Sequence, residues 1–354
     1  MASTPAGALG SFQISGDIAV AIPDHTRPVD VRPALQALAE RLHGKMQVVV
    51  GLGLHRRMNS GELSALKPWK VVQHDPDDCL PTCEVDGIPG KVFRLVLEAD
   101  WSVSIGIAEL HQYAGVSGGH KGVAVGCGGR ETIRALHHRD RVCSPGVVLG
   151  AVQGNPFRGC VDALGKAARC RLALVYVPAV RQWLAGDPVQ VIKHASELID
   201  PWTWVDTPAA GAVLRIPQSK GVSLYQASRA ATYLALSPRP AVKAGGTLVI
   251  EAPMSEGLGS ESGFVEALHR FSPPWTELLT GDIPQGAGAQ RGIMLALMGQ
   301  RYRLVLWGCK QPETFRRLGI EAHHKSFALP NNWLEVRQPF GCIPQLRSGG
   351  GRSE

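Results

Sequence analysis

Short apolar runs alternate with helical segments along most of this chain, and this alternation constrains the fold more than any other feature. Residues 18–22 and 46–50 are apolar runs of strand length, and apolar residues alternate with Ser and Gly at 103–107. A helix is predicted between the first two runs, at 32–43, with Pro33 in its first turn. Strands that alternate with helices predict a largely parallel sheet, and therefore the α/β class.

The same pattern returns in the second half, where strands are predicted at 213–216, 247–252 and 302–307 and helices at 224–236 and 291–300. A length of 354 residues exceeds one ordinary core and suits two α/β domains. We expect two domains with Rossmann-like βαβ sheets and an active site in the cleft between them. The expected bounds are 1–208 for the N-terminal domain and 209–330 for the C-terminal domain.

Two further segments carry expectations about this organisation. The stretch Asp200–Ala210 contains Pro and Trp, and we interpret it as a connection between the domains. Residues 331–354 are expected to pack back on the first domain. The Gly-, Ser- and Arg-rich end at 348–354 is expected to be disordered.

Composition limits the classes of partner. The net charge is +7, but the basic residues are scattered and form only pairs such as Arg56-Arg57, which indicates a solvated surface rather than a nucleic-acid interface. No apolar run approaches about 20 residues, so no membrane span is expected. The first ten residues do not resemble a signal peptide, and a cytoplasmic protein is the expectation. Eight cysteines include no C-x-x-C pair, which argues against a zinc site.

Reactive side chains follow the predicted strands. Asp24 and Arg27 come after the first strand, His55 after the second and His111 after the third. In parallel sheets, ligands bind beyond the carboxyl ends of the strands. The sequence therefore predicts that these four side chains converge on one site.

The segment 111–138 is rich in glycine, which lets backbone amides approach a phosphate or a flat ring closely. It is not a P-loop, because Lys121 is preceded by His120 and followed by Gly122. A G-x-G-x-x-G motif is also incomplete, since Arg56 stands where the third Gly belongs. Lys121 is compatible with a phosphate ligand, a Schiff-base former or a surface residue.

Two adjacent histidines, His137 and His138, end a predicted helix that includes residues 131–136. A neutral imidazole there can bind a metal. No carboxylate or thiol cluster supplies further ligands, so a metal carried by another group fits better than a site built entirely by protein.

Several ordered blocks support a family resemblance: Asp24-x-Thr26-Arg27-Pro28; Gly53-x-His55-Arg56; His111-x-x-Ala114-Gly115-x-Ser117-Gly118-Gly119-x-Lys121; Glu131-Thr132-Ile133 leading to His137; Asn155-Pro156; and Tyr225-Gln226-x-x-Arg229. In this order they resemble the nickel-pincer lactate racemase family. The resemblance spans about residues 20 to 260, and the block from His111 to Lys121 is its most specific part.

The resemblance implies a cofactor and the residues that hold it. The cofactor is the nickel-pincer nucleotide, a pyridinium mononucleotide whose two thio-acid groups hold nickel, and its covalent link falls on Lys121. Nickel coordination falls on His137, with His138 as an adjacent alternative that would instead cap a helix. The other cofactor-binding residues that the resemblance implies are Asp24, Thr26, Ser117, Gly118 and Gly119.

The resemblance also implies an activity, which is the racemisation or epimerisation of 2-hydroxy acids by proton-coupled hydride transfer through a 2-keto acid. His55 and His111 would serve as acid and base, because imidazole titrates near neutral pH. The substrate would be bound by Arg27 from the N-terminal domain and by Tyr225, Gln226 and Arg229 from the C-terminal domain. Proteins that synthesise the cofactor are the implied partners, together with the small 2-hydroxy acid.

The chain departs from the family pattern at three places. Leu110 precedes His111 where the family often has Pro, and Val125-Gly126 stands where Pro-Gly is common. Arg229 occupies the place of a lysine, and its planar fork differs from an ammonium at a carboxylate site. The substrate is thus expected to differ from lactate, unless either cation binds the same carboxylate.

Two other functions compete with this hypothesis. A nicotinamide-dependent 2-hydroxy-acid dehydrogenase would need an intact G-x-G-x-x-G after a strand, which the chain lacks. A non-catalytic protein that binds the nickel nucleotide would need no acid-base pair, whereas His55 and His111 are both present.

Overall fold

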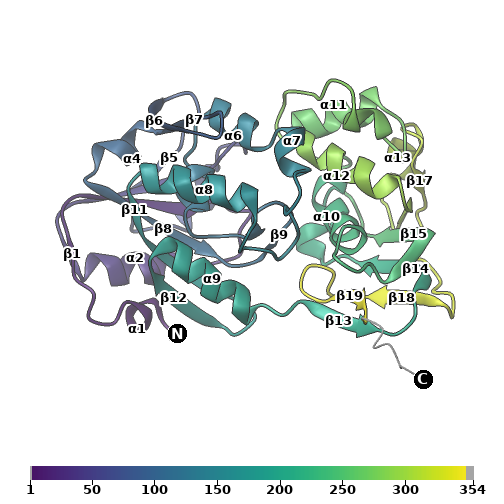
Figure 1. Ribbon diagram of the computed structural model, residues 1–354, viewed down its shortest axis with the longest axis horizontal. Helices are drawn as coiled ribbons and strands as arrows, with labels where there is room; N and C mark the ends of the chain where they lie inside the picture. Colours follow the sequence, from purple (N-terminus) through teal and green to yellow (C-terminus); the bar gives the residue numbers. More distant parts are fainter. Residues whose placement is uncertain (1, 348–354) are drawn as a thin grey trace. The chain divides into compact units, whose positions relative to one another are not determined.

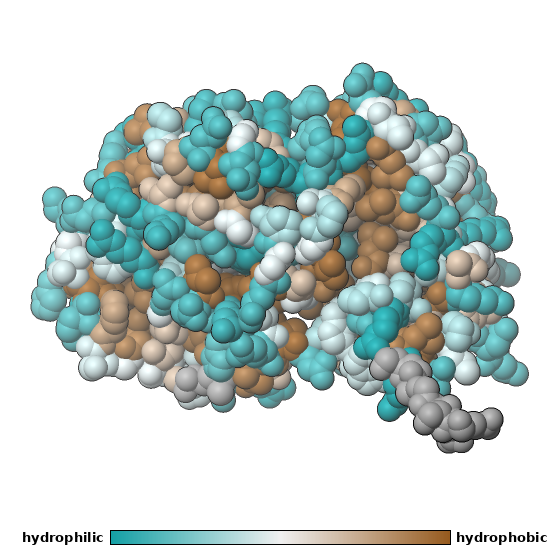
Figure 2. Space-filling view, viewed as in Figure 1, coloured by the Kyte–Doolittle hydropathy of each residue, from teal (hydrophilic) through white to brown (hydrophobic). Residues whose placement is uncertain are grey.

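The computed structural model describes residues 2–347, which divide into two compact units, Met1–Asp200 and Pro201–Glu354. The expected boundary at 208/209 lies eight residues further along the chain. Figure 2 shows hydrophilic residues over much of the visible surface of each unit, with patches of hydrophobic residues between them. No helix within residues 2–347 is long and apolar enough to cross a membrane.

The first unit is built on a six-stranded sheet in the order β12-β11-β8-β2-β4-β5 (Figure 1). All neighbours are parallel except β12, which runs antiparallel to β11. The strands are β2 (Ile18–Pro23), β4 (Met46–Gly51), β5 (Val71–Gln73), β8 (Trp101–Ile107), β11 (Cys170–Val177) and β12 (Gln182–Gly186). The predicted parallel sheet is therefore present.

Helices cover both faces of this sheet (Figure 1). Alternate residues of β2 point to opposite faces, so Val20 packs with Leu35 and Leu38 of one helix while Ala21 packs with Val123 on the other side. The helices of this unit are α1 (Pro5–Leu9), α2 (Arg32–Ala39), α3 (Ser60–Ser64), α4 (Arg94–Glu98), α5 (Lys121–Ala124), α6 (Arg130–Leu136), α7 (Arg139–Val142), α8 (Pro156–Ala167) and α9 (Pro188–Leu198). Short strand pairs add β1 (Ile14–Ser15) with β3 (Leu42–His43), β6 (Cys79–Val85) with β7 (Ile88–Phe93), and β9 (Leu110–His111) with β10 (Gly115–Val116).

The second unit has a parallel five-stranded sheet in the order β17-β16-β15-β14-β18. Its strands are β14 (Ala209–Arg215), β15 (Val242–Glu251), β16 (Arg303–Trp307), β17 (Glu321–Ala322) and β18 (Trp333–Val336), and β13 (Trp202–Val205) pairs separately with β19 (Ile343–Leu346). The helices are α10 (Leu224–Ala235), α11 (Ser262–Arg270), α12 (Ala289–Gly299) and α13 (Pro312–Arg316), with 3-10 turns η1 (Gln218–Lys220) and η2 (Thr276–Leu279).

Two expectations about the chain's course need correction. The helix predicted at 32–43 ends at Ala39, because residues 42–43 pair with β1 as the strand β3. The expected connection at 200–210 contains the strand β13. In the segment after 331, β18 extends the sheet of the second unit and β19 pairs with β13. The disorder expected at 348–354 lies outside the described residues.

His74, which follows β5, supplies a test of this packing. Its ring meets Phe93 edge-on with 5.5 Å between centroids, and its side chain is 1% exposed. Burial lowers the pKa of His74 to about 4, so the unfolded chain binds a proton at this residue between about pH 6.5 and 4 while the folded chain does not. Stability therefore falls as the pH falls through this window, by about 3 kcal/mol from this residue.

We expect His74→Leu to flatten the pH dependence of urea unfolding between pH 7 and 4.5, relative to the unaltered chain. The exposed His194→Leu is the matched control and should leave the dependence unchanged. Equal slopes for the unaltered chain and His74→Leu would contradict burial of a neutral His74.

Candidate active site

The carboxyl ends of three neighbouring parallel strands form the edge at which the candidate residues gather. Strand β2 lies between β4 and β8, and the chain order of the strands reverses between β2 and β8. Ligands in open α/β sheets bind where the strand order reverses in this way. Asp24 follows β2 directly, His55 follows β4 and His111 follows β8.

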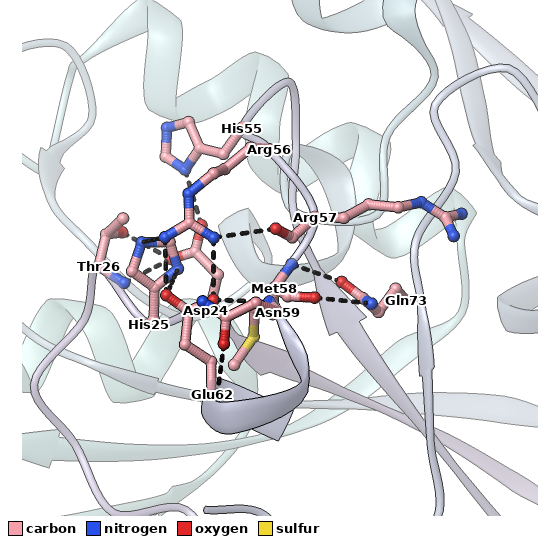
Figure 3. A network of polar contacts seen from close by, with 10 residues as sticks. All are labelled: Asp24, His25, Thr26, His55, Arg56, Arg57, Met58, Asn59, Glu62 and Gln73. Atoms are coloured by element: carbon pink, nitrogen blue, oxygen red, sulfur yellow. Dashed lines mark hydrogen bonds and ion pairs between the residues drawn. The ribbon is translucent and has the colours of Figure 1, made fainter. Parts of the chain in front are cut away.

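Asp24 and His55 come together at this edge (Figure 3). Asp24 Oδ2 lies 2.7 Å from His55 Nδ1, and Asp24 Oδ1 accepts from Thr26 through its backbone N–H at 3.0 Å and its hydroxyl at 2.5 Å. Burial alone raises the pKa of Asp24, but the bonds to His55 and Thr26 outweigh burial and hold that pKa well below its ordinary value. A buried carboxylate thus fixes the orientation of a half-exposed imidazole.

A second network holds the loop that follows His55 (Figure 3). Arg56 donates to both carboxylate oxygens of Glu62, at 2.7 and 2.9 Å. Glu62 also accepts from the backbone N–H of Asn59, whose side chain accepts from Glu62 N, and the two residues form a capping box at the start of α3. The bond to Arg56 is the main cause that lowers the pKa of Glu62 to about 2.

Arg27 pairs with a residue that the sequence did not single out. Its Nη1 lies 3.2 Å from Glu109 Oε2, and both side chains are about one-fifth exposed. Glu109 follows β8, so this pair joins the ends of two neighbouring strands. A substrate carboxylate at Arg27 would have to share that guanidinium with Glu109.

His111 and His137 both contact the ring of Tyr113. The ring centroid of Tyr113 lies 5.6 Å from that of His111 and 5.7 Å from that of His137, and both contacts are edge-on. His111 Nδ1 accepts from the backbone N–H groups of Tyr113, at 3.3 Å, and Ala114, at 3.1 Å. The structure thus gathers two of the predicted histidines around Tyr113, which the sequence did not mark as functional.

The ring of His137 is held through its Nδ1. Its Nδ1 lies 2.8 Å from the Ile133 carbonyl oxygen, which places the proton on Nδ1 and leaves a lone pair on Nε2. Burial lowers the pKa of His137 to about 4, and the charges of Lys121 and His55 act in the same direction. His138, by contrast, is exposed and its side chain caps α7 by accepting from Asp140 N. Of the two adjacent histidines, His138 caps a helix, whereas His137 keeps its Nε2 lone pair.

Glycines on both sides of Lys121 allow this segment to pack closely against α9 and β8. Gly118 and Gly119 have positive φ, and a Cβ on either would meet Ile192 of α9 at 3.0 Å or less. A Cβ on Gly122 would lie 2.2 Å from Ser104 Oγ on β8. The buried Ser117 hydroxyl donates to Ile107 O at 2.6 Å and accepts from Glu109 N at 3.0 Å. These residues hold the loop against the sheet.

Helix α8 fixes the same loop through polar side chains. Its N-cap residue Asn155 donates to Tyr113 O at 2.8 Å. Buried Arg158 donates to Ala114 O at 3.3 Å and Gly118 O at 3.4 Å, and it also bonds to Val116 O. These bonds give hydrogen-bond partners to backbone carbonyl groups that the buried loop would otherwise leave unsatisfied. Neither the bonds nor the buried cation could be read from the sequence, because the partners are about 40 residues apart.

The next turn of α8 completes this arrangement. Asp162 lies 3.6 Å from Arg158 Nη1 and 3.1 Å from His120 Nδ1, and His120 directly precedes Lys121. His120 Nε2 lies 3.2 Å from the Cys170 carbonyl oxygen. One face of α8 therefore contacts the chain all the way from Tyr113 to His120.

In the second unit, Tyr225, Gln226 and Arg229 lie on α10, whose N-cap Ser223 accepts from Gln226 N. Arg229 donates to Gln226 Oε1 at 3.4 Å and to the hydroxyl of Tyr233 at 3.1 Å. Helical spacing places Gln226 and Arg229 on one face, as the sequence motif requires. Tyr233 is a further polar partner that the sequence did not indicate.

Comparison with known proteins places this geometry in context. A family model described as the lactate racemase N-terminal domain matches residues 9–150. Lactate racemase of Thermoanaerobacterium thermosaccharolyticum is 25% identical over 268 residues, which are 69% of this chain and 62% of that protein. Lactate racemase of Lactiplantibacillus plantarum is 26% identical over 283 residues, 73% of this chain and 65% of that protein. Both matches take in less than two-thirds of the relative's length.

Two solved structures share the fold. The lactate racemase apoprotein from Thermoanaerobacterium thermosaccharolyticum superimposes with a TM-score of 0.82 at 18% identity, over 97% of this chain and 93% of that one. A structural-genomics protein from Thermotoga maritima gives a TM-score of 0.70 at 17% identity, over 97% of this chain and 96% of that one. Residues 9–150 thus match the lactate racemase N-terminal domain, and the chain is similar to two lactate racemases over about 70% of its length.

Proposed function

We propose that this protein is a nickel-dependent racemase or epimerase of 2-hydroxy acids, with its cofactor tethered to Lys121. The observation that carries the proposal is the setting of His137. This half-buried imidazole presents a lone pair at Nε2, and the charges of Lys121 and His55 both act to lower its pKa. A metal ligand, a candidate nucleophile and a candidate base are thus within electrostatic reach of one another.

The donor chemistry fits a nickel-pincer nucleotide. Within residues 2–347 no three His, Cys, Asp or Glu side chains converge as a metal site, so His137 would complete the coordination of a metal that the nucleotide holds. Lys121, in the first turn of α5, would form the covalent tether. When bound, the nucleotide supplies a reversible hydride acceptor, through which a 2-hydroxy acid and its 2-keto acid interconvert.

The residues of the sheet edge would handle the proton and the substrate carboxylate. His55 and His111 would exchange a proton with the substrate hydroxyl. The Asp24 carboxylate would stabilise the positive charge that His55 then carries. Arg27 would bind the substrate carboxylate, and its partner Glu109 keeps the guanidinium oriented toward the ends of β2 and β8. The glycine loop, Ser117 included, would act by holding Lys121 in place.

In the second unit, the residues that would bind the substrate are Tyr225, Gln226 and Arg229. Arg229 is already oriented by Gln226 and Tyr233, which favours planar recognition of a carboxylate. The matched relatives are named lactate racemases, whereas an arginine here favours a 2-hydroxy acid with a larger or second polar group.

The proposal is tested by the mass and metal content of protein purified from cells that make the cofactor. We expect an adduct on Lys121 and co-purifying nickel. Lys121→Ala should lose the adduct, whereas Lys166→Ala, on the exposed side of α8, should keep it. An unaltered chain with neither adduct nor nickel would contradict the proposal.

Removing either histidine should stop turnover without releasing the cofactor. We expect His55→Ala and His111→Ala each to slow enantiomer interconversion by at least about 100-fold, the usual scale of a general acid or base. Chiral chromatography measures the rate, and intact mass reports the retained adduct. His194→Ala, on the exposed face of α9, serves as the control. Unchanged turnover in either active-site variant would remove that residue from the mechanism.

Arg229 should decide which 2-hydroxy acid is preferred. We expect substrates with a second polar group to be turned over faster than lactate, and Arg229→Lys to lower kcat/KM for them by about 10-fold or more. A panel of 2-hydroxy acids measures both effects. A clear preference of the unaltered chain for lactate would contradict the assignment of Arg229.

A further inference from the structure

The two imidazoles at the sheet edge are held in opposite ways. His55 Nδ1 faces the carboxylate of Asp24 at 2.7 Å. A carboxylate only accepts hydrogen bonds, so Nδ1 bears the proton. In neutral His55 the lone pair is therefore on Nε2, the nitrogen turned away from Asp24.

His111 has the reverse arrangement. Its Nδ1 is contacted by the backbone N–H groups of Tyr113 and Ala114, which only donate. Nδ1 therefore carries the lone pair, and the proton of neutral His111 is on Nε2. Turning the ring over would place a carbon against both N–H groups and forfeit both bonds.

Helix α8 prevents the backbone from adapting to a different ring state. The peptide unit between Tyr113 and Ala114 donates its N–H to His111 and accepts at its carbonyl from Asn155 Nδ2, at 2.8 Å. The next carbonyl, of Ala114, accepts from buried Arg158. The donors that face His111 are thus clamped from behind.

We propose that Asp24 and Asn155 are positioning residues that give the two histidines opposite tautomers, so that His55 presents a base and His111 an N–H donor to the substrate. This inference rests on the proposed function and divides its acid-base work. The hydroxyl proton of a bound 2-hydroxy acid would pass from oxygen to His55 Nε2, and the nickel nucleotide would supply the acceptor for the hydride of C2. The resulting imidazolium is balanced by Asp24, and His111 donates a hydrogen bond from Nε2. The resting protein is then ready for the enantiomer whose hydroxyl faces His55.

Imidazole ¹⁵N spectra of the full-length chain labelled in its 12 histidines test this directly, because protonated and unprotonated ring nitrogens have well-separated shifts. Signals that disappear in His55→Gln and His111→Gln assign the two residues. Above the pH at which the rings are neutral, we expect a proton on Nδ1 of His55 and on Nε2 of His111. The same tautomer in both residues would overturn the inference while leaving the Lys121 adduct, and so the proposed function, intact.

Asp24→Asn provides a sharper test. The amide oxygen would still accept from Thr26, which turns the amide N–H toward His55 and forces its proton onto Nε2. The His55 spectrum should switch tautomer. The control is Asp100→Asn, a carboxylate that accepts from Asp17 N at the opposite end of the sheet, and it should leave the spectrum unchanged. An unswitched His55 in a folded Asp24→Asn chain would overturn the role of Asp24.

Asn155→Asp tests the clamp on His111. Aspartate keeps the N-cap of α8 but cannot donate to the Tyr113 carbonyl. We expect the His111 nitrogen signals to move toward a mixture of tautomers while those of His55 stay fixed. His111 signals that remain those of the unaltered chain would overturn the role of Asn155.

Substitution by glutamine separates base from donor in turnover, because its amide N–H can stand in for an imidazole Nε2–H but cannot take up a proton. We expect His111→Gln to lose about 10-fold in rate and His55→Gln more than about 100-fold. A His111→Gln protein as inactive as His111→Ala would overturn the donor role.

Discussion

The parallel direction of β2, β4 and β8 is the constraint on which the rest of the site depends. Because the three strands run the same way, the loops that leave them emerge at one edge, and side chains from residues 24 to 111 become neighbours. The Asp24–His55 bond and the Arg27–Glu109 pair each join two of these loops. If one of these strands ran the other way, its loop would leave the sheet at the opposite edge, and the contacts between the loops would be lost.

The polar face of α8 holds the loop between His111 and Lys121 in place through hydrogen bonds and ion pairs. Asn155, Arg158 and Asp162 recur at helical spacing and bind the chain between His111 and Lys121. Burying a guanidinium costs free energy that its acceptors offset, and removing one partner of such a buried pair typically destabilises by about 3–5 kcal/mol. The loop is thus tied to the first unit's core at the same points that orient its functional side chains.

Sequence reasoning reached the α/β class and the convergence of Asp24 with His55, because strand periodicity and position after a strand are local signals. The Asn59–Glu62 capping box was predictable for the same reason. Pairing between distant residues leaves no local signal, so the sequence indicates only a connection where β13 pairs with β19. The tautomers of His55 and His111 were also beyond reach, since they depend on which group faces Nδ1.

The clamp on the loop from Tyr113 to Gly118 acts on backbone carbonyls, which every residue type possesses. Other side chains within this loop can therefore be exchanged without loosening it, provided that Ser117 and the glycines with positive φ are kept. The scaffold and the surface that it presents are in this sense separable. Such a separation lets a single framework be adapted to new substrates by changing loop side chains while the positions of His111 and Lys121 stay fixed.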